Sequence, residues 1–163
     1  MRNLLEMIYE YQLLSSKERH LDIPLDDDER VRRMGLHRLL MGEVLDARRR
    51  RLARVALPMR VQFTRAGGFE LGEIRDLGGG GVCVQTSAPQ DPGTRVVLRV
   101  EAPDDGVEYV FPCRVVWRSS HGPRRMGLAF DGVPHQSELY GDESGVWRRT
   151  PRFGAVRDTS HVA

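Results

Sequence analysis

The sequence has little cysteine and no cluster of residues that would bind a metal. Its two cysteines, Cys83 and Cys113, lie in strand-like segments, and neither belongs to a CxxC pair or stands at zinc-binding spacing from a histidine. The five histidines are scattered along the chain, so no Cys–His or Ser–His–Asp catalytic set is indicated. We therefore expect two buried free thiols, no metal, no cofactor and no enzymatic activity.

Long apolar runs are also absent. No segment approaches the roughly 20 apolar residues that a membrane-spanning helix needs. The first residues, MRNLLEMIYEYQLL, include acidic side chains and lack the small-residue cleavage site of a secretory signal. These features predict a cytoplasmic protein in a reducing compartment, without a membrane partner.

Neither sign of charge dominates the chain. The 25 basic and 23 acidic residues give a net charge of +2, so a strong overall attraction to DNA or to a membrane is not expected. Lys17 is the sole lysine, and the remaining basic residues are arginines, whose guanidinium groups suit phosphates and guanine edges where they cluster. Small barrels that bind single strands usually expose aromatic side chains among basic ones. Few aromatic residues are expected at the surface here, so nucleic-acid binding ranks below the functions considered next.

Residues 1–47 have the spacing of two helices, interrupted at Pro24. Leu4, Leu5 and Ile8 recur at intervals of three and four, which predicts one largely apolar helix face. A second helix is predicted to begin at Asp26, where a glutamate three residues later completes a capping box. Its apolar stripe consists of Val31, Met34, Leu36, Leu39, Leu40, Val44 and Leu45. Either the two helices pack on the following domain or on each other, which we favour, or they form an arm for dimerisation or partner docking.

Residues 48–134 change to short segments that alternate or are rich in β-branched residues, each bounded by Gly, Pro or Asp. The predicted strands are Arg60–Arg65, Phe69–Leu77, Val82–Thr86, Arg95–Val100, Tyr109–Arg118 and Met126–Phe130. In the fifth, alternation places Cys113, Val115 and Trp117 on one face, the period of a half-buried strand. Six short strands with hairpin-length loops indicate a mainly β domain, either an antiparallel barrel or a sandwich.

Residues 135–163 show no periodicity. Gly, Ser, Asp and Arg dominate, and we expect a mostly irregular C-terminal tail. Its arginine cluster, Arg148, Arg149, Arg152 and Arg157, is either solvated, which is the commoner case, or contacts an acidic partner.

Two short motifs at the start of the β domain carry the functional prediction. Arg50 and Arg54 form an RxxxR pair before the first strand, and the sequence RDLGGGGV at residues 75–82 ends the second. Two guanidinium groups at this spacing can surround a compact anion, or contact the edge and face of a guanine. Asp76 can accept hydrogen bonds from a guanine edge, and glycines let backbone N–H groups approach a ligand closely. The pattern predicts a site for a guanine nucleotide that carries phosphates.

This combination resembles the PilZ domain, in which RxxxR is followed by a D/N-x-S-x-x-G segment on a six-stranded antiparallel β-barrel. Residues 54–63, CRVVW at 113–117 and MGLAF at 126–130 are similar to its first and last strands, so the resemblance covers about half of the chain. It implies a non-catalytic effector that binds the bacterial second messenger cyclic di-GMP. It assigns Arg50 and Arg54 to the phosphates and guanines, Asp76 to a guanine edge and Gly81 to the tight turn.

Gly78 departs from the family pattern, which usually has serine at this position. One lost side-chain hydrogen bond costs about 0.5–1.5 kcal/mol, or up to roughly tenfold in affinity. Four consecutive glycines also increase the entropy lost when the loop is ordered. The ligand-binding residues predicted here are Arg50, Arg54, Asp76, Gly78 and Gly81. The alternative is a ligand-free adaptor that acts through an unidentified protein partner, and a homodimer is compatible with either function.

Overall fold

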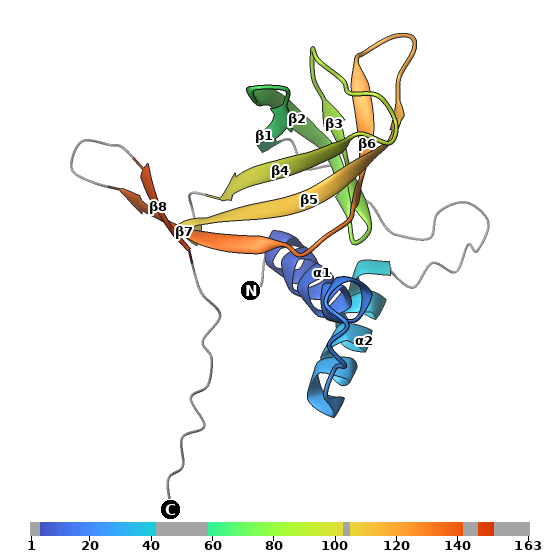
Figure 1. Ribbon diagram of the computed structural model, residues 1–163. Coiled ribbons are helices and arrows are strands. Elements are labelled where there is room, and N and C mark those ends of the chain that lie inside the picture. Colours follow the sequence, from blue (N-terminus) through green and yellow to red (C-terminus); the bar gives the residue numbers. More distant parts are fainter. Residues whose placement is uncertain (1–3, 42–58, 103–104, 142–146, 152–163) are drawn as a thin grey trace, which may run out of the picture.

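The computed structural model describes residues 4–41, 59–102, 105–141 and 147–151 (Figure 1). Two helices precede the strands: α1 spans Leu4–His20 and α2 spans Asp27–Met41. The strands are β1 (Met59–Arg65), β2 (Gly68–Gly78), β3 (Gly81–Gln85), β4 (Arg95–Ala102), β5 (Val107–Arg118), β6 (Arg125–Phe130), β7 (His135–Gly141) and β8 (Trp147–Pro151). No helix within these ranges is long and apolar enough to cross a membrane.

Strands β1 to β6 form a closed antiparallel barrel. Hydrogen-bonded neighbours follow the order β1, β2, β3, β6, β5 and β4, and β4 returns to β1, which closes the ring. The six predicted strands are confirmed, each within two residues of its predicted bounds. Inward-facing side chains such as Phe63, Ile74, Leu98 and Phe111 are almost completely buried and form one core. Both cysteines are buried, as predicted, and they form no disulfide with each other.

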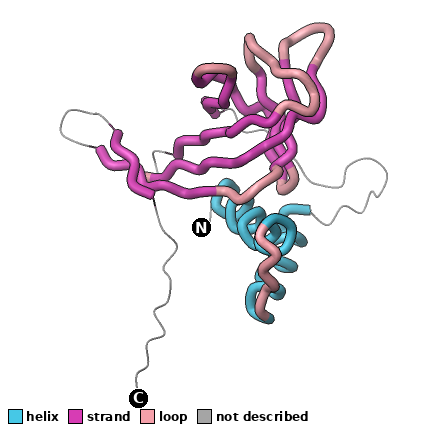
Figure 2. Tube along the Cα trace, viewed as in Figure 1, coloured by secondary structure: helices cyan, strands magenta, loops and turns pink. Residues whose placement is uncertain are grey.

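Two further strands lie in the segment for which an irregular tail was predicted. β7 pairs with residues 107–110 of β5, and β8 pairs with β7. This hairpin projects from one side of the barrel (Figure 2). The expectation of an irregular chain is therefore wrong for residues 135–141 and 147–151. Periodicity did not reveal β7 because its pairing depends on an edge of the long β5 strand, which is a tertiary feature.

Helix α1 lies across one end of the barrel (Figure 1). Leu5 and Ile8 belong to the barrel core, and the rings of Tyr9 and Tyr109 pack with their centroids 5.6 Å apart. The favoured interpretation, in which the helices pack on the domain or on each other, is confirmed for α1. The helix thus shares its hydrophobic core with the strands.

Helix α2 begins at the predicted capping box. The Glu29 backbone N–H donates to Asp26 Oδ1 at 2.8 Å, and the Asp26 N–H donates to Glu29 Oε2 at 3.2 Å. The helix packs against α1 through Leu36, which forms a small buried cluster with Leu14 and Leu25.

The apolar stripe predicted for α2 is buried only in part. Leu36 and Leu40 are buried, whereas Val31, Met34 and Leu39 are exposed. The favoured interpretation, packing within the protein, therefore accounts for only part of the stripe. Val44 and Leu45 lie outside the described residues.

Candidate functional site

The β2–β3 hairpin brings together three of the five predicted ligand-binding residues. A register shift in β2 between Ile74 and Asp76 pairs Asp76 with Cys83, and Gly78 pairs with Gly81 at the end of the ladder. The neighbouring Leu77 and Val82 point into the core, so Asp76 and Cys83 belong to the outer face of the barrel. Arg50 and Arg54 lie outside the described residues.

A single row of residues crosses this outer face on four strands. Asp76 of β2 pairs with Cys83 of β3, Cys83 pairs with Gly127 of β6, and Gly127 pairs with Trp117 of β5. Adjacent strands lie about 4.8 Å apart, so roughly 14 Å separates the backbones at the two ends of the row. Asp76 is half-buried, whereas Trp117 is 40% exposed.

Trp117 lies directly over Gly127. A Cβ atom added to Gly127 would stand only 2.0 Å from Trp117 Nε1, so the indole occupies the space that a side chain at residue 127 would need. Alternation predicted that Trp117 shares the buried face of Val115, and this is wrong. A register shift between Val115 and Trp117 turns the tryptophan outward. An exposed aromatic side chain that the alternation did not predict therefore lies in the same row as Asp76.

Gly81 has a structural requirement of its own. A Cβ atom at this position would lie 2.2 Å from the carbonyl oxygen of Leu128 on β6. Any larger residue would push β3 and β6 apart at the hairpin. Gly78 and Gly79 are buried, so the hairpin fits closely against its surroundings.

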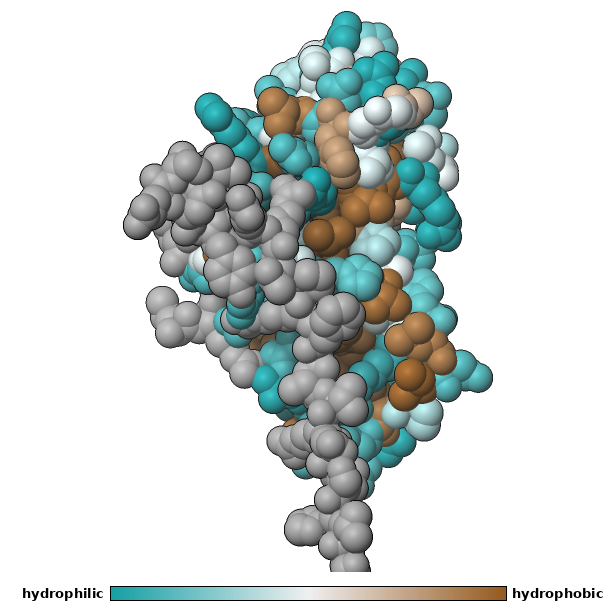
Figure 3. All heavy atoms as spheres, turned by 60° about the vertical axis from the view of Figure 1, so that its left-hand side comes forward, coloured by the Kyte–Doolittle hydropathy of each residue, from teal (hydrophilic) through white to brown (hydrophobic). Residues whose placement is uncertain are grey.

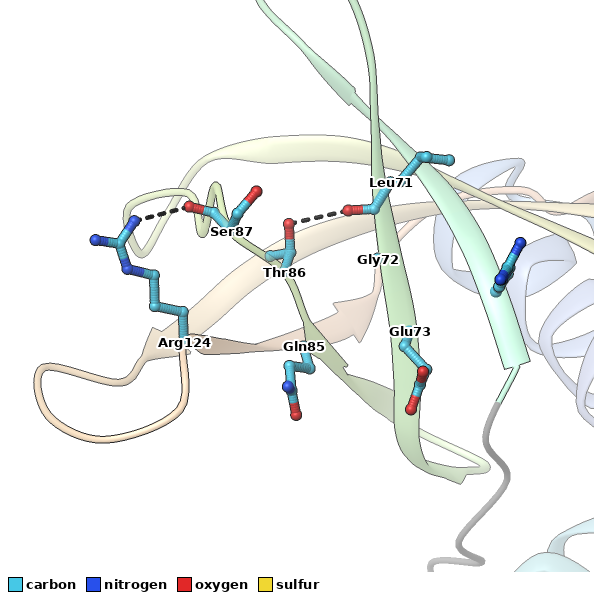
Figure 4. Close-up of a pocket in the computed structure, with 8 residues that line it drawn as sticks. Leu71, Gly72, Glu73, Gln85, Thr86, Ser87 and Arg124 are labelled. Carbon is cyan, nitrogen blue, oxygen red and sulfur yellow. Dashed lines mark hydrogen bonds between the residues drawn. The ribbon is translucent and has the colours of Figure 1, made fainter.

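A shallow cavity of about 480 Å³ lies farther along the same strands (Figure 4). The register aligns Arg60, Glu73 and Gln85 in the next row of the outer face, and all three line the cavity. At its other side, the Arg124 guanidinium donates to the Ser87 carbonyl at 3.0 Å. Within the described ranges, neither Arg60 nor Arg124 has a carboxylate at ion-pair distance. The outer face one row from Asp76 and Cys83 therefore carries Arg60 with Glu73 opposite it, and Arg124 adds positive charge at the other side of the cavity.

Two features bear on thiol and metal chemistry in the described part of the chain. Burial raises the pKa of the Cys113 thiol well above its ordinary range, so this thiol stays protonated at neutral pH. No group of three His, Cys, Asp or Glu residues in the described part of the chain is arranged to hold a metal ion. The features that the site does offer are a carboxylate, an exposed indole, a glycine hairpin and nearby guanidinium groups.

Comparisons with known proteins agree with this architecture. The model of the PilZ domain family matches residues 48–140, which extends past residue 134 into β7. No curated protein matches the chain. Among solved structures, the chain is similar to the PilZ domain of CeSA from a cellulose-synthesizing bacterium, at 25% identity over 48% of this chain and 80% of that one, with a TM-score of 0.40.

It is also similar to a tetrameric PilZ-domain protein of Xanthomonas campestris that self-assembles through a helical bundle. That similarity has 16% identity, covers 82% of this chain and 71% of the other, and gives a TM-score of 0.32. The family match carries the assignment, since it includes more than half of the residues and all six strands of the closed barrel. The chain belongs to the PilZ domain family.

Proposed function

We propose that this protein is a non-catalytic receptor for cyclic di-GMP. PilZ domains are in general receptor domains for this messenger. The observation that carries the proposal for this chain is the outer row with Asp76 at one end and Trp117 at the other. A carboxylate accepts hydrogen bonds from the N1–H and N2–H₂ edge of guanine, and an exposed indole stacks on a purine face. Together these groups fit a ligand that carries guanine bases.

Arg50 and Arg54 complete the proposed site with positive charge. The chain enters β1 at Met59, which pairs with Ile74, two residues before Asp76. An extended chain spans at most about 3.6 Å per residue, so Arg54 is tethered within about 18 Å of Met59. Arg50 lies four residues earlier, within about 32 Å of Met59, so the chain is long enough for both arginines to reach the same face of the barrel.

Calorimetric titration with cyclic di-GMP tests this function directly. We expect saturable binding that the Arg50→Ala/Arg54→Ala double variant loses, because the guanidinium groups neutralise the phosphates. Base–aromatic stacking contributes about 1–3 kcal/mol per base, so Trp117→Ala should weaken binding about fivefold or more. Phe69→Ala is the matched control, since Phe69 is also an exposed aromatic residue of the barrel but lies at the far end of β2.

Binding that is equal for the wild type and both arginine and tryptophan variants would place the ligand elsewhere and contradict the proposed site. Absence of binding at tens of micromolar would contradict the proposed function.

The second candidate is a ligand-free adaptor. It is favoured by the glycine at residue 78 in place of serine, and by the exposed apolar residues Val31, Met34 and Leu39 on α2. An adaptor would capture its protein partner equally well with and without cyclic di-GMP. Partner capture that depends on the nucleotide would favour the receptor instead.

A further inference from the structure

Helix α1 contacts the glycine hairpin of the proposed site through a hydrogen bond. The side-chain amide of Gln12 donates from Nε2 to the carbonyl oxygen of Gly79 at 2.5 Å. The two residues are 67 positions apart in the sequence, and Gln12 is only 6% exposed. A buried glutamine that reaches across to a turn carbonyl is a specific link between the helix and the hairpin.

Helix α1 is fixed on both sides of Gln12. Toward its N-terminus, Leu5 and Ile8 are buried in the barrel core. Toward its C-terminus, His20 Nε2 lies 3.7 Å from Asp131 Oδ1, just after β6 ends. Contacts between the helix and the barrel therefore lie on both sides of Gln12.

The hairpin has no side chains with which to fix itself. Residues 78–81 are all glycine, and glycine loses more backbone entropy on ordering than any other residue. Its two central residues are instead held by hydrogen bonds from outside the turn. Gln12 donates to the Gly79 carbonyl, and the Phe130 N–H of β6 donates to the Gly80 carbonyl at 3.1 Å. A buried carbonyl left without a donor costs free energy, so each bond restricts the turn.

We infer that Gln12 is a positioning residue for the ligand site, and that through it the docking of α1 and the binding of ligand are coupled. This inference rests on the proposed function. Gly79 lies next to Gly78 and three residues after Asp76, so the conformation that Gln12 stabilises is the one from which these groups meet the ligand. Binding affinities that are linked in this way are reciprocal. A ligand that orders the hairpin therefore strengthens the attachment of α1, and a firmly docked α1 strengthens ligand binding.

Through this coupling, ligand binding changes how firmly the helices are attached to the barrel. Helix α2 packs on α1 through Leu14, Leu25 and Leu36. A change in the docking of α1 consequently reaches the exposed side of α2 through direct packing. The hairpin, Gln12 and the two helices thus form one continuous set of contacts.

The test compares the full-length wild type with Gln12→Met and Gln90→Met. Methionine keeps the length of the side chain and removes the donor. Gln90 is the matched control, because its Nε2 also donates to a backbone carbonyl, that of Ala88 at 2.8 Å, but it lies beyond the opposite end of β3. Cyclic di-GMP affinity is measured by calorimetry, and hydrogen exchange is followed in peptides that cover residues 76–84 and residues 4–20.

We expect Gln12→Met to weaken cyclic di-GMP binding by up to about tenfold, the effect of one hydrogen bond. Exchange at residues 76–84 should increase in the unliganded variant, while exchange in β4 and β5 stays unchanged. Ligand should protect residues 4–20 in the wild type more than in the variant. Gln90→Met should bind within about twofold of the wild type, since its bond lies outside this set of contacts.

A role limited to general stability predicts a different pattern. In that case Gln12→Met would raise exchange in every segment and leave affinity unchanged, which overturns the inference. If the methionine variant does not fold, Gln12→Asn serves in its place, because it keeps an amide but is one methylene too short to reach Gly79. Failure of the wild type to bind cyclic di-GMP would overturn the proposed function. The exchange comparison of the unliganded proteins then still decides whether Gln12 positions the hairpin.

Discussion

The two helices have similar lengths and similar apolar spacing, yet they have different environments. In α1, the apolar residue Ile8 is completely buried among the strands. In α2, Val31 is 65% exposed and Leu39 is 69% exposed. Helix α2 is held to α1 by a small cluster and by ion pairs such as Lys17–Glu29 and Arg33–Glu18, and among its described residues only Leu40 reaches the barrel core. Helix α1 is part of the barrel, whereas α2 is an attachment to it with one apolar side uncovered.

This difference shows that an amphipathic pattern does not identify the surface that covers it. Hydrophobic spacing follows helix geometry, and it is the same for a face in a core and for a face that meets another protein. Hydrophobic residues also reach the surface elsewhere, in a broken band bordered by hydrophilic ones (Figure 3). On α2, the exposed side is the part of the helix pair available to a partner.

Replacement of Ile8 by alanine should give the largest effect. Ile8 has no exposed surface, and truncation of a buried aliphatic side chain typically lowers the free energy of unfolding by about 2–5 kcal/mol. Val31→Ala, in the corresponding test on α2, should change it by less than about 0.5 kcal/mol. Chemical denaturation of both variants provides the measurement. Equal losses for the two variants would remove the distinction between the helices.

Loss of the α2 cap should give an intermediate effect. Asp26 Oδ1 accepts the Glu29 N–H at 2.8 Å, and replacement of such a cap by alanine costs about 0.5–2 kcal/mol. Because Leu40 is the one described residue of α2 in the barrel core, we expect Asp26→Ala to increase hydrogen exchange in residues 27–41 before it affects the strands. An increase of equal size in β1 to β6 would show that α2 unfolds only together with the barrel.

The barrel was predictable from the sequence because its strands are short, alternating and bounded by turn residues. The position of Asp76 just before a glycine turn was likewise predictable from RDLGGGGV. The capping box predicted the start of α2. These signals are local. Each depends on residues within a few positions of one another.

The features that were missed depend on tertiary structure. The outward position of Trp117 results from a register shift that breaks the alternation of β5. The contact of Gln12 with Gly79 joins residues 67 positions apart, and no sequence pattern in either segment predicts it. The strand β7 forms because β5 offers an edge for pairing. Sequence patterns predicted a candidate site, but they did not predict the outward position of Trp117 or the hydrogen bond from Gln12 to Gly79.

The smallest effect on stability, and the one most informative about partners, is expected for the exposed side of α2. Leu39→Ser removes an apolar side chain that is 69% exposed, so the free energy of unfolding should change by less than about 0.5 kcal/mol. Cyclic di-GMP affinity should also stay the same, because Leu39 is exposed and is not among the residues that join the helices to the hairpin. Binding of a partner protein, or self-association measured by sedimentation velocity, should weaken if this side is a contact surface. A Leu39→Ser variant that unfolds readily would instead mean that this side of α2 is covered within the monomer. The two helices would then differ only in how much of their apolar surface is buried.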